Sequence, residues 1–162
     1  MQIIYQPIGI IHSPFTSLHG MPIQPTAETA APGTVELYPE FEEGMQDLDG
    51  FSHIMLFYHF HCSSGFELTV TPYLDTVKRG MFATRAPRRP NPIGLSVVRM
   101  TAIEGPLVRV ANLDILDGTP LLDIKPYVPE YHTAEPVRTG WISGTKGAVR
   151  TALSDSRFSE PA

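Results

Sequence analysis

Proline is the residue that most limits what this chain can fold into. Sixteen of the 162 residues are proline, about twice the average share of about 5%. A proline inside a helix costs about 3 kcal/mol, because it lacks the amide donor and its ring clashes with the preceding turn. The sequence therefore excludes a bundle of long helices and favours strands joined by ordered loops.

Length and composition fit one folded domain. A single core normally serves roughly 100 to 200 residues, and 42% hydrophobic against 18% charged residues is enough to bury one. No apolar run approaches the roughly 20 residues needed to cross a bilayer, and Met1–Ile11 lacks the pattern of a signal peptide. The single cysteine, Cys62, cannot form an internal disulfide. We therefore expect a cytoplasmic protein.

Short runs of β-forming residues recur between turn signals along the chain. They predict a mainly β fold, with a largely antiparallel sheet that closes on itself or packs on a partner. One short helix is expected at Pro39–Asp47, where proline suits a first turn and glutamates complement the helix dipole. The seven candidate strands are Ile3–Ile11, Thr34–Tyr38, Phe51–His61, Glu67–Tyr73, Ile93–Ile103, Leu107–Ile115 and Leu121–Val128.

Two segments lack any strand or helix pattern. Ser13–Gly33 is rich in Pro, Thr and Ala, and an ordered loop of that length is more often functional than neutral. We expect a loop there that is a candidate lid. Thr151–Ala162 has low hydrophobicity and is expected to be a loose tail.

The most unusual segment is Lys78–Gly94, KRGMFATRAPRRPNPIG, which holds five of the twelve basic residues and no acid. Pro87, Pro90 and Pro92 stiffen it, so the arginines and Asn91 are held with little further loss of entropy. It indicates either a preorganised site for anions and polar bases or a stiff corner with solvated arginines. The net charge of −5 argues against a protein that coats nucleic acid by bulk charge.

A second informative segment, Leu113–Tyr127, reads LDILDGTPLLDIKPY. Asp117 and Gly118 predict a tight turn, so Asp117 is expected to be structural. Asp114 and Asp123 stand in apolar runs, where an ionised carboxylate is costly unless it is paired. Each should contact a lysine or arginine, backbone amides or a ligand.

Two further chemistries have weaker support. His59 and His61 form an HxH pair that could bind a metal in a cupin-like jelly roll, with Glu67 or His53 as further ligands. Nucleophilic catalysis by Cys62 competes with its use as a small packed side chain. No glycine fingerprint or phosphate-loop lysine motif marks a nucleotide site.

Four blocks of the sequence together resemble the TrmO family, also called TsaA-like or VirR-like. The similarity spans about residues 3–131 and keeps two long signatures in the expected order, FATRxPxRPNPIG and LDxxDGTPxxDIKPY. The blocks are Ile8–Pro14, Leu48–His61, Phe82–Ser96 and Leu113–Tyr127.

The resemblance implies a single small antiparallel β-barrel over residues 1–135, with one short helix and long loops, and a C-terminal extension and tail over residues 136–162. It implies a homodimer that binds S-adenosylmethionine and methylates N6 of N6-threonylcarbamoyladenosine in the tRNA anticodon arm. By residue match, the cofactor contacts would be Pro22, Ile23, Gln24, His61, Cys62, Arg85, Val97, Leu113, Asp114, Ile115 and Leu116.

Methyl transfer requires the protein mainly to align the acceptor nitrogen with the methyl carbon and to exclude water. An acylated N6 is a poor nucleophile, so a base that takes its proton should help. Guanidinium groups offer planar forks for the threonyl carboxylate and nearby phosphates. We assign catalytic roles to Asp114 and His61 as candidate bases, and to Arg85 and Asn91, and substrate binding to Arg88, Arg89, Lys125 and Tyr127.

Alternatives stay open at this point. Asn91 either recognises a base edge or braces its loop. The barrel either methylates tRNA, or binds S-adenosylmethionine for another acceptor, or uses the His59 and His61 pair in metal-dependent chemistry.

Overall fold

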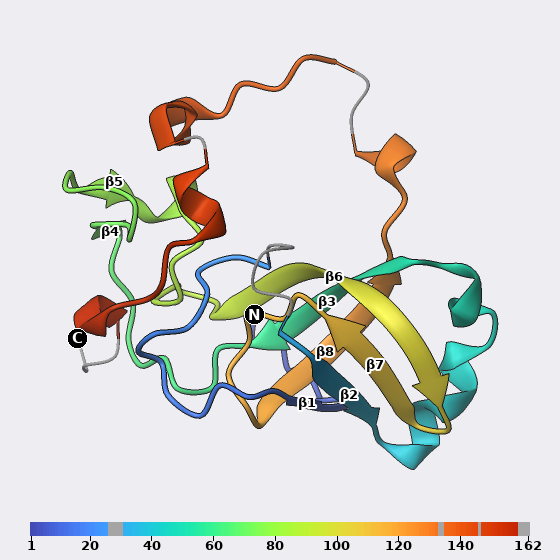
Figure 1. The fold of residues 1–162 in the computed structure, drawn as a ribbon. Coiled ribbons are helices and arrows are strands. Elements are labelled where there is room, and N and C mark those ends of the chain that lie inside the picture. The colour runs from blue at the N-terminus through green and yellow to red at the C-terminus, as the bar shows by residue number, and fades with distance from the viewer. Residues whose placement is uncertain (26–30, 133–134, 146, 159–162) are drawn as a thin grey trace.

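A closed barrel forms the centre of the protein (Figure 1). The computed structural model describes residues 1–25, 31–132, 135–145 and 147–158. All neighbouring barrel strands are antiparallel, which confirms the predicted closed antiparallel sheet. In order around the barrel, the strands are β1 (Gly9–His12), β2 (Gly33–Leu37), β7 (Leu107–Ala111), β6 (Ile93–Glu104), β3 (His53–His59) and β8 (Thr119–Pro126).

The barrel interior is the hydrophobic core. Side chains alternate along β3, so that Ile54, Leu56 and Tyr58 are buried inside while their neighbours are only partly buried on the outer face. The partner strands contribute mainly Ile, Leu and Val at the matching positions. Ser96 on β6 is a polar exception, and it too is fully buried.

Four predicted strands are shorter than expected, among them Phe51–His61, which forms only as His53–His59. Two of the four have identifiable reasons. The first begins only at Gly9, because the chain before it, including Pro7, has no strand to pair with; residues 1–7 are exposed. The strand predicted at Leu107–Ile115 ends at Ala111, because Asn112 takes the left-handed conformation with φ 64°. This turn removes the next six residues, 113–118, from the sheet.

The remaining elements are short. Of the strand predicted at Glu67–Tyr73 only β4 (Thr69–Val70) forms, and it pairs with β5 (Arg79–Gly80) outside the barrel. The predicted helix is a 3-10 helix that ends earlier than expected, at Met45. The 3-10 helices are Pro39–Met45, Leu48–Gly50, Met81–Ala83, Pro129–Tyr131, Gly140–Thr145, Ala148–Arg150 and Ser156–Phe158.

The prediction of a loose tail is wrong for residues 151–158. Phe158 is buried with Val70, Met81 and Ala86 in a second small core, and Ser154 is buried as well. Figure 1 shows this C-terminal segment, in red, returning beside β4 and β5. The tail therefore helps to build the loops above the barrel, and the residues at 159–162 lie outside the described part of the chain, as do residues 26–30 of the expected lid.

No helix in the described ranges is long and apolar enough to span a membrane. The division into a barrel over residues 1–135 and an extension over residues 136–162 stays a prediction.

Candidate functional site

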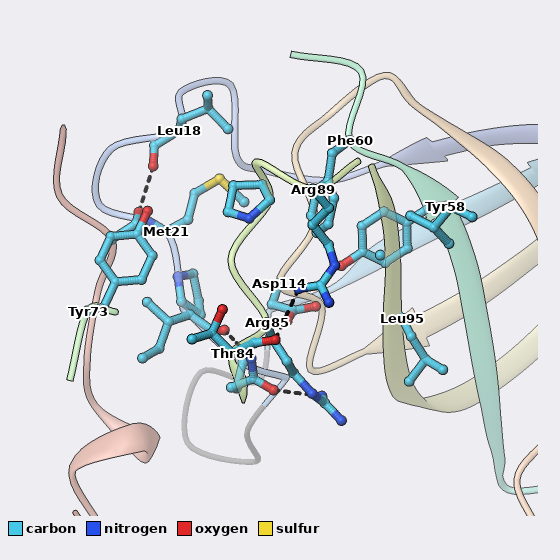
Figure 2. Close-up of a pocket in the computed structure, with 17 residues that line it drawn as sticks. Leu18, Met21, Tyr58, Phe60, Tyr73, Thr84, Arg85, Arg89, Leu95 and Asp114 are labelled. Carbon is cyan, nitrogen blue, oxygen red and sulfur yellow. Dashed lines mark hydrogen bonds between the residues drawn. The ribbon is translucent and has the colours of Figure 1, made fainter. Parts of the chain in front are cut away.

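A cavity of about 370 Å³ opens where β3 ends and β6 begins (Figure 2). We call it the Asp114 cavity. This size is within the range of small-molecule sites. It is lined by Leu18, Met21, Pro22, Ile23, Gln24, Tyr58, Phe60, Tyr73, Thr84, Arg85, Pro87, Arg89, Ile93, Gly94, Leu95, Asp114 and Ser154.

Asp114 reaches the cavity because the chain leaves the barrel at Asn112. Its Oδ1 accepts a hydrogen bond of 2.6 Å from Ser96 Oγ. The Tyr58 hydroxyl lies 3.2 Å from the same Ser96 oxygen. Because the Ser96 proton points to Asp114, Tyr58 is the donor to Ser96. The three groups therefore form a chain that runs from the barrel interior to the cavity.

Burial raises the pKa of the Asp114 carboxyl to about 6, against the opposing effects of the Ser96 hydrogen bond and the Arg85 charge. Burial and the neighbouring Asp114 also raise the pKa of Tyr58. Tyr58 thus stays protonated at neutral pH and serves as a donor. Asp114 changes its protonation close to neutral pH, which is a property of functional carboxyl groups.

Arg85 connects the basic segment to the long loop. Its Nη1 donates a hydrogen bond of 2.9 Å to Gln24 Oε1, and Gln24 Nε2 donates to the Ile23 carbonyl at 2.7 Å. The guanidinium is itself exposed at the cavity. This arrangement brings two segments that are far apart in the sequence to one wall.

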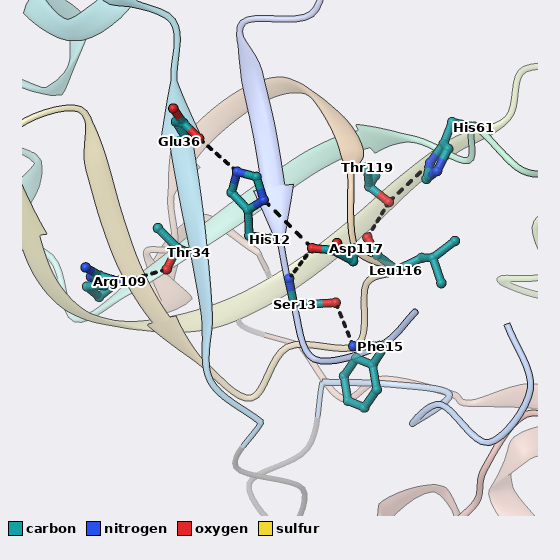
Figure 3. Close-up of polar contacts among 10 residues, drawn as sticks. All are labelled: His12, Ser13, Phe15, Thr34, Glu36, His61, Arg109, Leu116, Asp117 and Thr119. Atoms are coloured by element: carbon teal, nitrogen blue, oxygen red, sulfur yellow. Dashed lines mark hydrogen bonds and ion pairs between the residues drawn. The ribbon is translucent and has the colours of Figure 1, made fainter. Parts of the chain in front are cut away.

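His61 lies in a smaller adjoining pocket of about 80 Å³, which shares Tyr58, Phe60 and Asp114 with the Asp114 cavity. Thr119 Oγ1 donates to the Leu116 carbonyl at 2.7 Å and lies 3.3 Å from His61 Nδ1 (Figure 3). Because the Thr119 hydroxyl proton is used in the bond to Leu116, the hydroxyl oxygen can only accept from His61. The imidazole proton is therefore on Nδ1, and Nε2 has the free lone pair. Partial burial and the neighbouring His59 lower the pKa of His61, which favours its neutral form.

The turn before this pocket is held by Asp117. Its Oδ1 accepts a hydrogen bond of 3.0 Å from the Ser13 amide (Figure 3), and Gly118 follows with φ 74°. The structural role predicted for Asp117 is confirmed. Asp123 pairs with Lys125 at 2.7 Å, which is one of the contacts expected for it.

The C-terminal segment holds the loop Ser13–Gly33 in place at Leu18 and Met21. Ser154 Oγ donates to the Leu18 carbonyl at 2.6 Å and accepts from the Met21 amide at 2.9 Å. The Ser154 amide also donates to the Met21 carbonyl at 2.7 Å. Leu18 and Met21 both line the Asp114 cavity, so the tail shapes that cavity.

The structure places many of the predicted site residues at these two cavities. Pro22, Ile23, Gln24, Arg85 and Asp114 line the Asp114 cavity, and His61, Cys62, Ile115 and Leu116 line the adjoining pocket. Leu113 instead belongs to the barrel core. Val97 lies on the outer face of β6 and lines neither cavity, because the inward positions are Ser96 and Val98.

The basic segment divides into different roles. Arg88 is buried and its Nη1 donates to Glu67 Oε1 at 2.7 Å, so this side chain braces the loop. Arg89 lines the Asp114 cavity, but its Nη1 donates to the Thr84 carbonyl at 3.0 Å. Asn91 is exposed and outside both cavities. Of Arg85, Arg88 and Arg89, Arg85 is the one with an exposed side chain.

Two residues assigned to substrate binding lie elsewhere. Lys125 stands near the end of β8, opposite the end that begins at Thr119 beside His61. Tyr127 stacks on His132, with ring centroids 4.9 Å apart. Neither lines the Asp114 cavity or the His61 pocket.

Sequence reasoning missed the lining residues Tyr58 and Met21, and it missed Ser96, which is buried in the barrel and donates to Asp114. A signal existed for Ser96, since it is a hydroxyl at an inward position of an apolar strand, where it needs a partner. The role of Ser154 depends on a contact across more than a hundred residues, for which a single sequence carries no local signal.

The described residues do not support a metal site at His59 and His61. β3 ends at His59, so His61 leaves the strand and turns towards Thr119. Within the ranges that the structure describes, no group of three or more His, Cys, Asp or Glu side chains is placed to hold a metal ion. Cys62 is exposed.

Comparison with known proteins gives consistent matches. Residues 10–133 match the family model of the tRNA-methyltransferase O N-terminal domain. A Pyrococcus abyssi protein named a probable S-adenosyl-L-methionine-binding protein is 53% identical over 158 residues, which cover 98% of this chain and 86% of that protein. The human tRNA (adenine(37)-N6)-methyltransferase is 31% identical over 142 residues, 83% of this chain and 32% of the human protein.

A solved structure agrees with the sequence matches. The crystal structure of TrmO from Pseudomonas aeruginosa superimposes with a TM-score of 0.73 at 40% identity. The superposition covers 87% of this chain and 63% of that one. The chain thus spans less than two thirds of the solved TrmO and about a third of the human enzyme.

Proposed function

Because this chain belongs to the family of tRNA-methyltransferase O N-terminal domains, we propose that it transfers a methyl group from S-adenosylmethionine to N6 of an adenine in tRNA. The observation that carries the proposal is the Asp114 cavity, where a carboxyl with a pKa raised to about 6 faces the same space as the Arg85 guanidinium. The names of the Pyrococcus and human relatives support the same cofactor and reaction.

The lining of the cavity fits this cofactor. When bound, S-adenosylmethionine supplies an activated methyl group on a positively charged sulfur. Asp114 offers a carboxylate to such a cation, and Arg85 offers a planar fork to the carboxylate of its amino-acid part. Leu18, Met21 and Phe60 offer apolar surface to a nucleobase.

The residues of the chain then have distinct tasks. Ser96 and Tyr58 hold the Asp114 carboxylate in one orientation. The loop that Ser154 holds lines the cavity through Leu18 and Met21, whose apolar side chains disfavour water beside the reacting groups. We propose His61 as the base that accepts the proton of the acceptor nitrogen, because its Nε2 has a free lone pair and it lines the adjoining pocket. Asp114 is the second candidate base, because it is ionised above about pH 6.

We further propose that the acceptor is N6-threonylcarbamoyladenosine beside the anticodon. Support comes from Arg89, a second guanidinium that lines the same cavity and can pair with a threonyl carboxylate while Arg85 holds the cofactor. The rival is a different methyl acceptor on the same barrel.

A transfer assay separates these acceptors. The purified chain is incubated with methyl-labelled S-adenosylmethionine and matched tRNAs that carry or lack the threonylcarbamoyl group. Label on the modified tRNA alone is the expected result. Label on the unmodified tRNA would establish a different acceptor, and label on neither would contradict the proposed activity.

We also propose a homodimer in the cytoplasm, as in the family resemblance. Analytical ultracentrifugation of the purified chain at micromolar concentration should give twice the monomer mass of 17.9 kDa. A monomer mass at all concentrations would contradict the dimer.

A further inference from the structure

A second, larger cavity of about 660 Å³ lies beside the Asp114 cavity. We call it the Trp141 cavity. Part of its wall comes from the C-terminal segment, beyond the residues 10–133 that match the family model. Its lining is Ile23, Gln24, Pro72, Tyr73, Leu74, Phe82, Ala83, Thr84, Arg85, Ala86, Pro87, Trp141, Ile142, Val149 and Phe158.

The two cavities share one wall. Gln24, Tyr73, Thr84, Arg85 and Pro87 line both of them. A methyl acceptor must approach the donor directly, so a substrate that reaches the Asp114 cavity has the Trp141 cavity as its immediate surroundings.

The Trp141 cavity combines aromatic rings with guanidinium groups. Trp141 is held by its indole N–H, which donates to the Ala83 carbonyl at 2.8 Å. The Arg79 guanidinium lies 5.7 Å from the centre of the Trp141 ring. Phe82 is 78% exposed, with the Arg89 guanidinium 5.9 Å from its ring. The guanidinium is attracted to the face of the ring, and the exposed Phe82 ring keeps surface on which a planar group can stack.

This combination is the chemistry of single-stranded nucleic-acid binding. Bases stack on aromatic side chains, and basic groups follow the phosphates. The protein carries a net charge of −5. Within Lys78–Arg89, Arg79 pairs with Asp75 and Arg88 with Glu67. Arg85 and Arg89 instead donate to neutral oxygens, of the Gln24 amide and the Thr84 carbonyl, and so keep their positive charge beside Phe82. Charge complementarity therefore favours RNA over an apolar small molecule or an acidic protein at this face.

We propose that the Trp141 cavity receives an unpaired base of the RNA substrate, which stacks against Trp141 and Phe82 next to the Arg85 wall. This inference rests on the proposed function, because it assumes that the partner is RNA. It assigns the C-terminal segment a direct part in substrate binding.

The chain offers a direct probe, because Trp141 is its only tryptophan. Intrinsic fluorescence of the full chain is titrated with an anticodon stem-loop RNA that has adenosine 3′ of the anticodon. We expect saturable quenching by the stem-loop, and weaker quenching by free adenosine. Tight RNA binding with unchanged Trp141 fluorescence would overturn the proposal.

Three variants test the stacking. Trp141→Ala and Phe82→Ala should each raise the Kd for the stem-loop about 5-fold or more, whereas Trp141→Phe, which keeps a ring, should change it by less. Tyr131→Ala is the control, since Tyr131 is 82% exposed and lines neither cavity. Phe82 is so exposed that Phe82→Ala should leave the fold intact. This variant therefore tests the stacking even if Trp141→Ala fails to fold.

Calorimetry with S-adenosylhomocysteine on the same proteins separates the two proposals. Unchanged cofactor affinity together with lost RNA affinity in both alanine variants supports the stacking site. RNA affinity equal to that of Tyr131→Ala in both alanine variants overturns it. If the unmutated chain binds no S-adenosylhomocysteine but RNA still quenches Trp141, the proposed function fails and the stacking site stands.

Discussion

Ser96 Oγ donates a hydrogen bond of 2.6 Å to Asp114 Oδ1. The bond joins an inward-facing side chain of β6 to a loop residue eighteen positions later in the chain. The bond stabilises the ionised carboxylate, whereas burial favours the neutral acid. The balance puts the pKa of Asp114 at about 6. Ser96 is therefore a positioning residue for the group at the centre of the site.

Replacing Ser96 by alanine should raise the pKa of Asp114 further, because the opposing hydrogen bond is lost. The acid limb of the kcat/KM profile for methyl transfer should then move to higher pH. Ser52→Ala, at an exposed position just before β3, should leave the limb in place. An acid limb that is the same in both variants would show that Asp114 does not govern the profile.

Replacing Asp114 by asparagine should stabilise the fold and abolish cofactor binding. The pKa is raised from 3.8 to about 6, so the folded protein holds a proton that the unfolded chain has released. The free energy of unfolding therefore falls as the pH rises between these values. Above about pH 6 the whole free-energy cost of ionising the buried carboxyl is present.

The asparagine variant avoids this cost. Denaturant unfolding should show it more stable than the unmutated chain by about 2–3 kcal/mol near about pH 8, with the difference vanishing near about pH 4. A variant that is less stable at about pH 8 would contradict the assigned pKa.

Replacing Ser154 by alanine should loosen the loop over the Asp114 cavity. The change removes the bonds to the Leu18 carbonyl and from the Met21 amide, at a cost of about 1–3 kcal/mol for the buried groups left unpaired. Hydrogen exchange of the Met21 amide should accelerate and cofactor affinity should fall. Ser156→Ala, at an exposed position in the same segment, should do neither; an unchanged exchange rate in Ser154→Ala would show that the tail does not hold the loop.

Replacing Gly94 by alanine should displace the Tyr58 ring. A Cβ at Gly94 would lie 2.2 Å from Tyr58 Cε2, and such overpacking typically costs about 1–3 kcal/mol. Gly44→Ala is a matched control, because a Cβ there meets nothing within 4 Å. Thermal unfolding should separate the two variants clearly, and equal melting temperatures would contradict the close packing of Tyr58 on β6.

The barrel was largely predictable because its strands follow local rules. The alternation in Phe51–His61 and the turn at Asp117 and Gly118 are short-range signals, and both appear in the structure. The ends of strands were less predictable. Asn112 ends β7 because its backbone is left-handed. A single asparagine in the sequence is not enough to predict that conformation.

The site was predictable where long signatures name its residues and not where distant segments meet. Asp114, Arg85 and Gln24, which the resemblance names together as cofactor contacts, line one cavity; the contacts themselves stay a prediction. Arg88 follows the same motif but pairs with Glu67, since a basic run does not reveal which members find an acid. The contribution of the tail through Ser154 and Phe158 depends on packing alone.

The most direct test of the account is isothermal titration calorimetry of the purified chain with S-adenosylhomocysteine. We predict one site per chain, weakened about 10-fold or more by Arg85→Ala through loss of a charge-assisted hydrogen bond, and unchanged by Arg138→Ala, whose exposed side chain lines none of the cavities described above. No binding by well-folded protein, or equal binding by both variants, would contradict the assignment of the Asp114 cavity as the methyl-donor site.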